Sequence, residues 1–214
     1  MGLRCQRPFG LYHAPMTEGR QLWLVRHGET AWSRDGRHTG VTDIPLTDKG
    51  RAQAESLGAR LIGHSFALAL TSPRSRALET AQLAGFPNAL PDPDLAEWDY
   101  GALEGMRSAE IQIDYPRWTI WTGPWPDGET ADQVSARADR IVARCLAPEV
   151  TSDSLLFGHG HMLRVLAARW LGLPGESGAL FGLGTASVSV LGWEHARPII
   201  EMWNESEGPP AAAW

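Results

Sequence analysis

The sequence predicts an α/β fold in which helices cover both faces of one mainly parallel sheet, giving three layers. Three observations predict it. Short apolar runs at 22–25, 66–70 and 154–157 are typical of buried strands. Amphipathic helical patterns lie between these runs, and strands that alternate with helices favour parallel pairing. At 214 residues the chain is also long enough to bury one sizeable core.

The first long helix is predicted to begin at Thr47. Threonine is a favoured N-cap residue, and Ala54, Leu57 and Leu61 recur on one helical face after it. The segment between the first strand and this helix, 31–45, is rich in polar residues and is predicted as a loop.

The second strand, at 66–70, is predicted to end at Thr71-Ser72-Pro73. A helix follows, with the proline in its first turn. Arg76 and Thr80 are neighbours on this helix, because residues four apart share one helical face. The segment 85–94 contains three prolines and is predicted to be irregular.

A tryptophan-rich segment, 111–128, is predicted to form a lid or side wall, with Trp118, Trp121 and Trp125 among prolines and glycines. Thr130 and Gln133 then match a helix-starting capping box. Apolar residues at helical spacing indicate that this helix is long: Val134, Ala138, Ile141 and Cys145.

The last part of the chain repeats the strand and helix pattern. The strand at 154–157 is followed by a helix that Gly172 and Pro174 are expected to end. Two final strands are predicted at 188–191 and 198–202.

The predicted organisation is one domain with short flanks. We assign 1–20 to an N-terminal extension, 21–205 to the domain and 206–214 to a C-terminal tail. Cys5 and Cys145 have neither the number nor the spacing of a disulfide framework or a metal site, so a reducing, cytoplasmic location is expected.

The net charge excludes some partners. A charge of −6 and a pI near 5.6 argue against a general nucleic-acid binder. No apolar run is long enough to cross a bilayer, so no membrane partner is expected. A small anionic ligand therefore needs a local cationic pocket, and arginine must supply it, since Lys49 is the single lysine.

Two strand ends each carry a histidine followed by glycine. His27-Gly28 follows the strand at 22–25, and His159-Gly160 follows the strand at 154–157. Ligands of open α/β sheets bind at the carboxyl ends of strands, so both imidazoles face one pocket if these strands are neighbours. Arg26 beside His27 keeps its positive charge, and this pair suits attack on an anionic group such as phosphate.

Five segments along the chain carry a further resemblance. They are Arg26-His27-Gly28-Glu29-Thr30; Thr39-Gly40 with Asp43-Ile44-Pro45-Leu46-Thr47; Ser72-Pro73-Arg74-Ser75-Arg76-Ala77 with Thr80-Ala81; Leu95-Ala96-Glu97 through Tyr100-Gly101 to Glu104-Gly105; and His159-Gly160. In this order they resemble the histidine phosphatase superfamily, which has the phosphoglycerate-mutase-like fold. The resemblance extends from about Leu22 to Trp203 and favours the branch of acid phosphatases and sugar-bisphosphate phosphatases.

The resemblance implies a catalytic role for each matching residue. His27 is expected to be the nucleophile that accepts the phosphoryl group. Arg26, Arg76 and His159 are expected to bind the phosphoryl oxygens, and Glu97 is expected to protonate the leaving group and then to activate water. Neither a metal nor a cofactor is expected, because arginine and histidine supply the positive charge.

Further residues match positions that contact substrate in this family. They are Ser33, Thr39, Gly40, Tyr100, Gly160 and His161, with Ser33 standing where relatives often have asparagine. Glu104 is expected to hold a loop, and the histidines outside the motifs are interpreted as surface residues: His13, His38, His64 and His195.

The expected activity is hydrolysis of a small phosphorylated metabolite. The alternative enzyme is a phosphoglycerate-mutase-type phosphotransferase, but such mutases usually carry an arginine-bearing insert, and 111–128 supplies only Arg117. Two other classes stay open: an inactive binding module on this fold, and a metal hydrolase that uses His159 and His161 as ligands. A homodimer is compatible with this function.

Overall fold

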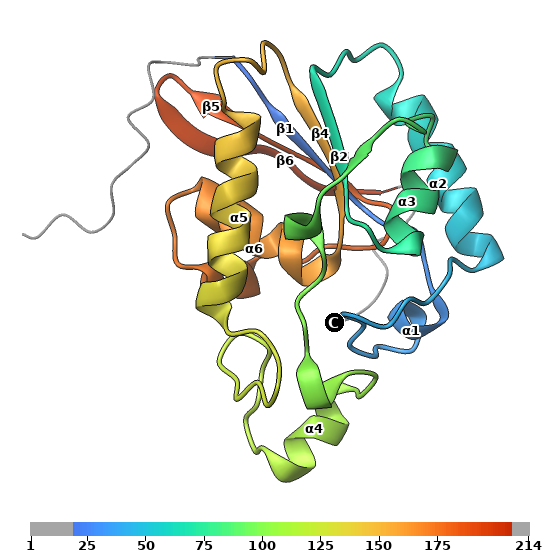
Figure 1. The fold of residues 1–214 in the computed structure, drawn as a ribbon, viewed down its shortest axis with the longest axis vertical. Coiled ribbons are helices and arrows are strands. Elements are labelled where there is room, and N and C mark those ends of the chain that lie inside the picture. The colour runs from blue at the N-terminus through green and yellow to red at the C-terminus, as the bar shows by residue number, and fades with distance from the viewer. Residues whose placement is uncertain (1–18, 207–214) are drawn as a thin grey trace, which may run out of the picture.

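The computed structural model describes residues 19–206, which form a six-stranded sheet with helices on both faces (Figure 1). The strands in sheet order are β3 (Leu90–Pro91), β2 (Leu68–Thr71), β4 (Ser154–Gly158), β1 (Leu22–Arg26), β5 (Val188–Glu194) and β6 (Arg197–Glu205). Most of the predicted extension and all but the first residue of the predicted tail lie outside the described residues, as do Cys5 and His13.

The sheet is mixed, with a parallel core. Strand β1 pairs in parallel with β4, and β4 and β3 both pair in parallel with β2. Strands β5 and β6 form an antiparallel hairpin at one side. The β1–β4 register places Arg26 opposite Gly158, so the residues that follow these two strands leave the sheet at one level. The predicted α/β class is confirmed, and the antiparallel hairpin is the part that the prediction did not specify.

Six α-helices connect the strands in the described part of the chain. Their bounds are α1 Ala31–Arg34, α2 Asp48–Leu61, α3 Ser75–Leu83, α4 Ser108–Asp114, α5 Ala131–Cys145 and α6 Gly160–Trp170. Three short 3₁₀ turns add to them: η1 Pro93–Leu95, η2 Gly101–Leu103 and η3 Gly175–Leu180. Within residues 19–206, no helix is both long and apolar enough to cross a membrane.

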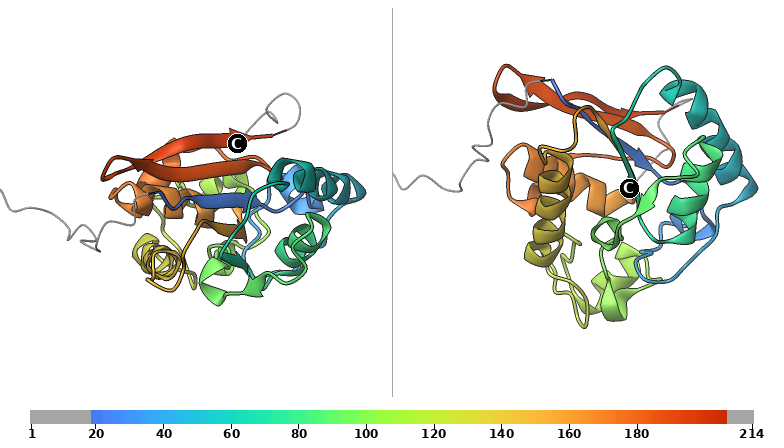
Figure 2. Two further views of the ribbon diagram at one scale, coloured as in Figure 1. Left: turned by 90° about the horizontal axis from the view of Figure 1, so that it is seen from above. Right: turned by 45° about the horizontal axis from the view of Figure 1, so that its top comes forward.

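Alternation along β1 explains the three layers, which are visible in two further views (Figure 2). Leu22 and Leu24 belong to the cluster that includes residues of α5 and α6, whereas Trp23 and Val25 pack with residues of α2 and α3. Successive strand residues point to opposite faces, so each face of β1 has its own helical layer.

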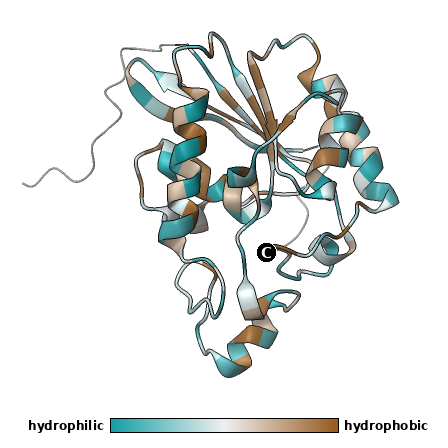
Figure 3. Ribbon diagram, in the orientation of Figure 1, coloured by the Kyte–Doolittle hydropathy of each residue, from teal (hydrophilic) through white to brown (hydrophobic). Residues whose placement is uncertain are grey.

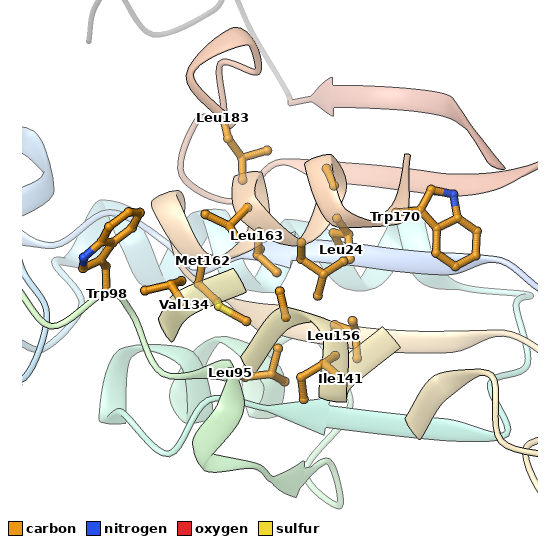
Figure 4. Close-up of a cluster of buried hydrophobic side chains, with 14 of the residues drawn as sticks. Leu24, Leu95, Trp98, Val134, Ile141, Leu156, Met162, Leu163, Trp170 and Leu183 are labelled. Atoms are coloured by element: carbon orange, nitrogen blue, oxygen red, sulfur yellow. The ribbon is translucent and has the colours of Figure 1, made fainter. Parts of the chain in front are cut away.

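Apolar residues are concentrated on the central strands and on the helix faces turned toward them (Figure 3). The larger cluster fills the space between the sheet, α5 and α6 (Figure 4). Leu24 and Leu156 contribute from the strands, Ile141 from α5 and Leu163 from α6, and each is at most 1 % exposed. This packing fixes the start of α6, and with it His159, against the ends of β1 and β4.

The predicted helix signals are confirmed at several ends. Thr47 accepts the Gly50 N–H at 3.0 Å and caps α2. Thr130 and Gln133 form the capping box of α5. Gly172 adopts a left-handed conformation just after α6. Arg20, the last residue of the predicted extension, is fixed to the domain because its guanidinium donates to the carbonyls of residues 146, 147 and 150 beyond α5.

Three local predictions are wrong in detail. The predicted loop 31–45 begins with helix α1, which a capping box between Thr30 and Ser33 supports. Pro73 lies before α3 and not in its first turn, because Arg74 is the extended N-cap residue. The proline-rich segment 85–94 contains the two-residue strand β3, which tolerates Pro91 because it is at the sheet edge.

Candidate active site

Two imidazoles meet where β1 and β4 end. The rings of His27 and His159 are 5.1 Å apart between centroids and lie nearly edge to face. The backbone N–H of His27 donates to the carbonyl of Gly158 at 3.0 Å, which ties one strand end to the other. His27 is 5 % exposed and His159 is 0 % exposed. The structure therefore brings together the two strand ends that the sequence analysis placed in one pocket.

The hydrogen bond of His27 selects one tautomer. Its Nδ1 is 2.7 Å from the carbonyl oxygen of Gly28, and because this oxygen can only accept, Nδ1 carries the proton. The lone pair is then on Nε2. Burial, with the nearby charges of Arg76 and Arg26, lowers the pKa of His27 well below its usual 6.5. His27 is therefore a neutral imidazole with an available nitrogen lone pair.

His159 is held at both ring nitrogens. Arg76 Nε donates to its Nδ1 at 3.2 Å, so Nε2 carries the proton and donates to the Ser72 hydroxyl oxygen at 2.6 Å. Burial and the charge of Arg76 lower the pKa of His159 well below 6.5, so this imidazole is also neutral.

Arg76 is completely buried and points its guanidinium at backbone carbonyls. It donates to the carbonyl oxygens of Thr39 at 3.0 Å, Gly40 at 3.2 Å and Thr42 at 3.0 Å. Burial lowers the pKa of Arg76, while Glu97 and Asp43 raise it. Arg76 thus links His159 to the loop that follows α1.

A cavity of about 540 Å³ opens beside this pair. It is lined by eight of the residues that the sequence analysis selected: Arg26, His27, Ser33, Thr39, Glu97, Tyr100, Gly160 and His161. The other three, Arg76, His159 and Gly40, are not among the lining residues. Arg76 and His159 support the cavity from behind through the contacts described above.

Arg26 presents positive charge to the cavity. One of its terminal nitrogens donates to the carbonyl of Leu183, whereas its buried Nε has no hydrogen-bond partner within residues 19–206. A Cβ on Gly160 would lie 3.3 Å from the guanidinium carbon, so glycine allows the helix start to approach this closely. A buried donor of this kind suits an anionic ligand.

The Glu97 carboxylate is fixed at the N-terminus of α6. One oxygen accepts the backbone N–H groups of Trp98 at 2.9 Å and Met162 at 2.8 Å, and the other accepts that of His161 at 3.0 Å. The bonds from His161 and Met162 satisfy N–H groups that the start of α6 otherwise leaves unpaired. They also hold the carboxylate at the cavity, where it can exchange a proton with a ligand.

Tyr100 and His161 form a hydrogen-bonded pair, with the hydroxyl 2.6 Å from Nδ1 of the imidazole. Burial and Glu97 raise the pKa of Tyr100, so its hydroxyl stays protonated. Burial and Arg164 lower the pKa of His161 well below 6.5. His161 is therefore a neutral imidazole whose Nδ1 is held by Tyr100.

His38 lies in the cavity wall, so its interpretation as a surface residue is wrong. Its ring is 4.8 Å from that of Tyr100 and 5.2 Å from that of Trp118, and burial lowers its pKa to about 4. The chain reverses direction after α1, and the backbone of His38 pairs with residues 105 and 106, which a loop pattern could not reveal.

Three predicted contact residues have local roles. The Ser33 hydroxyl serves the capping box of α1, and Thr39 donates its hydroxyl to the Arg37 carbonyl at 3.1 Å. Gly40 donates its N–H to both oxygens of Glu104, at 2.9 and 3.0 Å. A Cβ on Gly40 would lie 2.4 Å from the Trp98 carbonyl oxygen, so this position requires glycine for packing. Glu104 holds the loop, as expected.

The tryptophan-rich segment supplies part of the cavity wall. Trp118 and Trp121 line the cavity, as predicted for a lid or side wall. Trp125 does not; its ring stacks on that of Trp98 at 5.9 Å, and its Nε1 donates to the Ile120 carbonyl.

Arg164 is a cavity residue that no sequence motif indicated. It lines the cavity, with its guanidinium carbon 4.6 Å above the Trp121 ring, and Nε donates to the Gly178 carbonyl at 3.0 Å. Its position three residues after His161 was the available signal, because such residues share a helical face. In the part of the chain that the structure describes, no group of three or more His, Cys, Asp or Glu could hold a metal ion.

The chemistry that this arrangement supports is transfer of a phosphoryl group, which depends on a positioned nucleophile and on fixed positive charge around the phosphoryl oxygens. Comparison with known proteins agrees with this class. The chain belongs to the histidine phosphatase superfamily (branch 1), whose family model matches residues 22–206. It is therefore a phosphatase of this family.

The relatives include phosphatases of different names. An acid phosphatase of Mycobacterium tuberculosis is 45 % identical over 178 residues, which cover 82 % of this chain and 87 % of that protein. A sedoheptulose 1,7-bisphosphatase of Saccharomyces cerevisiae is 36 % identical over 181 residues, which cover 70 % of this chain and 67 % of that protein. Among solved structures, a mycobacterial glucosyl-3-phosphoglycerate phosphatase has a TM-score of 0.79 at 29 % identity, covering 88 % of this chain and all of that one.

Proposed function

We propose that this phosphatase hydrolyses a small phosphorylated metabolite, a sugar phosphate, a sugar bisphosphate or a wider set of monoesters, through a phosphohistidine on His27. One observation carries the proposal. The Gly28 carbonyl fixes the proton of His27 on Nδ1, so the Nε2 lone pair is available beside a cationic cavity.

In the first step, Nε2 of His27 attacks phosphorus while the bond from phosphorus to the ester oxygen breaks. Glu97 gives a proton to the leaving alkoxide. Arg26 stabilises the charge on the phosphoryl oxygens, since its buried Nε–H has no acceptor within residues 19–206. The alcohol leaves, and the phosphoryl group stays on Nε2.

In the second step, water attacks the phosphohistidine. The Glu97 carboxylate takes the water proton, and the nitrogen–phosphorus bond breaks to release inorganic phosphate and neutral His27. Arg76 and His159 act from behind the cavity wall. The bonds of Arg76 to the loop carbonyls hold its guanidinium, and with it the neighbouring His159 imidazole, in place.

The position of Arg117 supports hydrolysis over mutase-type transfer. It is the arginine that the tryptophan-rich segment supplies, and it is exposed and absent from the cavity lining. The residues of this segment in the cavity wall are mainly aromatic, apolar or hydroxyl-bearing, so they offer no extra cation to retain a second phosphoryl group.

Hydrolysis of p-nitrophenyl phosphate by wild type and His27→Ala tests the proposal. Loss of the nucleophile is expected to lower kcat roughly a thousandfold or more. A chelator is expected to leave the wild-type rate unchanged, because no step uses a metal. The matched control is His195→Asn, a substitution in the exposed β5–β6 turn, which is expected to keep full activity. Near-wild-type turnover by His27→Ala, or loss of wild-type activity with the chelator, would refute it.

A further inference from the structure

The cavity is positively charged although the chain carries a net charge of −6. Four arginines and two glutamates line it: Arg26, Arg34, Arg37, Arg164, Glu29 and Glu97. Both glutamates already have partners, because Glu29 pairs with Lys49 Nζ at 2.9 Å and Glu97 accepts three backbone N–H groups. The cavity therefore has more positive charge than one phosphoryl group at His27 requires.

The positive charge is divided between two parts of the wall. Arg26 and His27 come from the end of β1, where the phosphoryl group is expected to bind. Arg164 contacts other elements: its guanidinium lies over Trp121 of the tryptophan-rich segment and donates to the carbonyls of Gly178 and Ala179 in η3. A cavity of about 540 Å³ has room for a metabolite that extends from one part to the other.

Arg164 is better suited to a ligand anion than the other two arginines of the wall. Arg34 is exposed and pairs with Asp35 at 3.1 Å, and within residues 19–206 the Arg37 guanidinium is held by one carbonyl, that of Gly105 at 2.7 Å. Arg164 is oriented by an aromatic ring and by two carbonyls, and a fixed, planar guanidinium binds carboxylate or phosphate with little loss of entropy.

The surroundings of Arg164 favour an incoming negative charge. Burial and the like charge of Arg26 lower the pKa of Arg164 to about 10, although the Glu97 carboxylate acts in the opposite direction. His161 lies close enough to respond to the Arg164 charge, and because Tyr100 occupies its Nδ1, Nε2 is the ring nitrogen that can donate to a ligand when it carries the proton. An anion at this point would offset the repulsion between the two guanidiniums.

We propose that Arg164, with His161 beside it, forms a second anion subsite that binds an acidic group at the end of the substrate away from His27. The preferred substrates are then phosphomonoesters that carry a second anionic group, a carboxylate or a phosphate. This inference rests on the proposed function and narrows it to one substrate class.

Competitive inhibition of p-nitrophenyl phosphate hydrolysis tests the subsite. The two inhibitors are 3-phosphoglycerate and glycerol 3-phosphate, which differ in a carboxylate against a hydroxymethyl group. Wild type is expected to bind 3-phosphoglycerate roughly 10- to 100-fold more tightly, the usual value of a hydrogen-bonded charge. Arg164→Gln is expected to bring the ratio of the two inhibition constants close to one, and Arg164→Lys to keep part of it. Fructose 1,6-bisphosphate against fructose 6-phosphate repeats the comparison with phosphate as the second anion.

Two further variants make the result specific to Arg164. Arg140→Gln, on the exposed side of α5, is the matched control and is expected to keep the wild-type ratio. Equal inhibition constants in wild type, a ratio that survives in Arg164→Gln, or a ratio lost only in Arg37→Gln would overturn the subsite while leaving the phosphatase intact. Absence of p-nitrophenyl phosphate hydrolysis by wild type would instead overturn the proposed function.

Discussion

His159 depends on Ser72 for its tautomer, that is, for which ring nitrogen carries the proton. In the structure, Nε2 of His159 donates to the Ser72 hydroxyl oxygen, and Nδ1 accepts from Arg76. Nδ1 must stay unprotonated to accept from Arg76, because a guanidinium nitrogen can only donate. The Ser72 hydroxyl oxygen supports this tautomer by accepting the proton that Nε2 then carries. The fully buried Ser72 is thus a positioning residue for the second imidazole.

Ser72→Ala is expected to lower kcat for p-nitrophenyl phosphate by roughly 10- to 100-fold, as for other groups that orient an active-site histidine. KM is expected to change less. The ¹⁵N chemical shifts of the His159 ring are expected to show a changed tautomer balance. Ser75→Ala, in which the lost hydroxyl contacts Asp43 outside the cavity, is the control. A folded Ser72→Ala variant with wild-type kcat and unchanged shifts would contradict this role.

Site residues could be predicted from the sequence where a motif lies at the end of a predicted strand. His27 and His159 each follow a buried apolar run, and both lie at the site. His38 and Arg164 were missed, because a loop residue and a helical arginine in an arginine-rich chain give no pattern until the fold brings them together. Gly40 matches the motif, but the structure uses it to let the loop pack against Trp98.

At the scale of elements, the loop between α1 and α2 is what holds Arg76 in place. The carbonyls of Thr39, Gly40 and Thr42 accept from the Arg76 guanidinium. Glu104, from the turn after η2, holds the loop in turn by accepting the N–H groups of Gly40 and Thr42. A carboxylate that is not part of the cavity lining therefore keeps the cationic support of the cavity ordered.

Glu104→Ala is expected to reduce both stability and activity. Two backbone N–H groups lose their acceptor, at a cost of roughly 1–3 kcal/mol for each group that stays buried. The loop then holds Arg76 less firmly, so kcat is expected to fall as well. Urea unfolding and steady-state kinetics measure the two effects. Glu110→Ala, which removes an exposed capping carboxylate of α4, is the control. Unchanged kcat in Glu104→Ala would show that the loop does not support Arg76.

Long elements could be predicted because their signals are repeated. Helix α5 has a capping box and an apolar stripe, and α2 has Thr47 at its start. Helix α1 has four residues and β3 has two, which is too short for any hydrophobic period to develop. The position of α1 depends on the local capping box between Thr30 and Ser33, and that of β3 depends on pairing with β2, which is a tertiary contact.

At the scale of the whole molecule, the site makes stability depend on pH. Burial lowers the pKa of four histidines: His27, His38, His159 and His161. In the unfolded chain these residues titrate near their ordinary value of about 6.5. Above that pH both states are neutral at these sites. Below it the unfolded chain takes up protons that the folded chain does not, so acid favours unfolding.

The free energy of unfolding is therefore expected to fall between pH 7.5 and pH 5.5. The slope below pH 6.5 is at most about 1.4 kcal/mol per pH unit for each histidine. Urea denaturation at several pH values measures it. His38→Gln is expected to reduce this slope by up to the contribution of one histidine. His195→Asn, in the exposed turn, is expected to keep the wild-type slope. Equal stability at both pH values would contradict the buried, neutral histidines.

The general architecture was predictable, but the order of the strands was not. Alternating strands and helices predict a mainly parallel sheet with helices on both faces, and this is confirmed, with β5 as the antiparallel strand. The placement of β4 directly beside β1, which brings the two histidines together, comes from pairing between residues more than 130 positions apart, such as Leu22 and Ser154. No local pattern specifies such a pairing.

The central claim is that Nε2 of His27 carries the phosphoryl group between the two steps. The most direct measurement is rapid quenching of wild-type enzyme with ³²P-labelled substrate at alkaline pH, followed by mass spectrometry of the labelled peptide. The account predicts an acid-labile, base-stable phosphoryl group on His27 that disappears as phosphate is released. Turnover with no protein-bound phosphoryl group, or with the label on another residue, would contradict it.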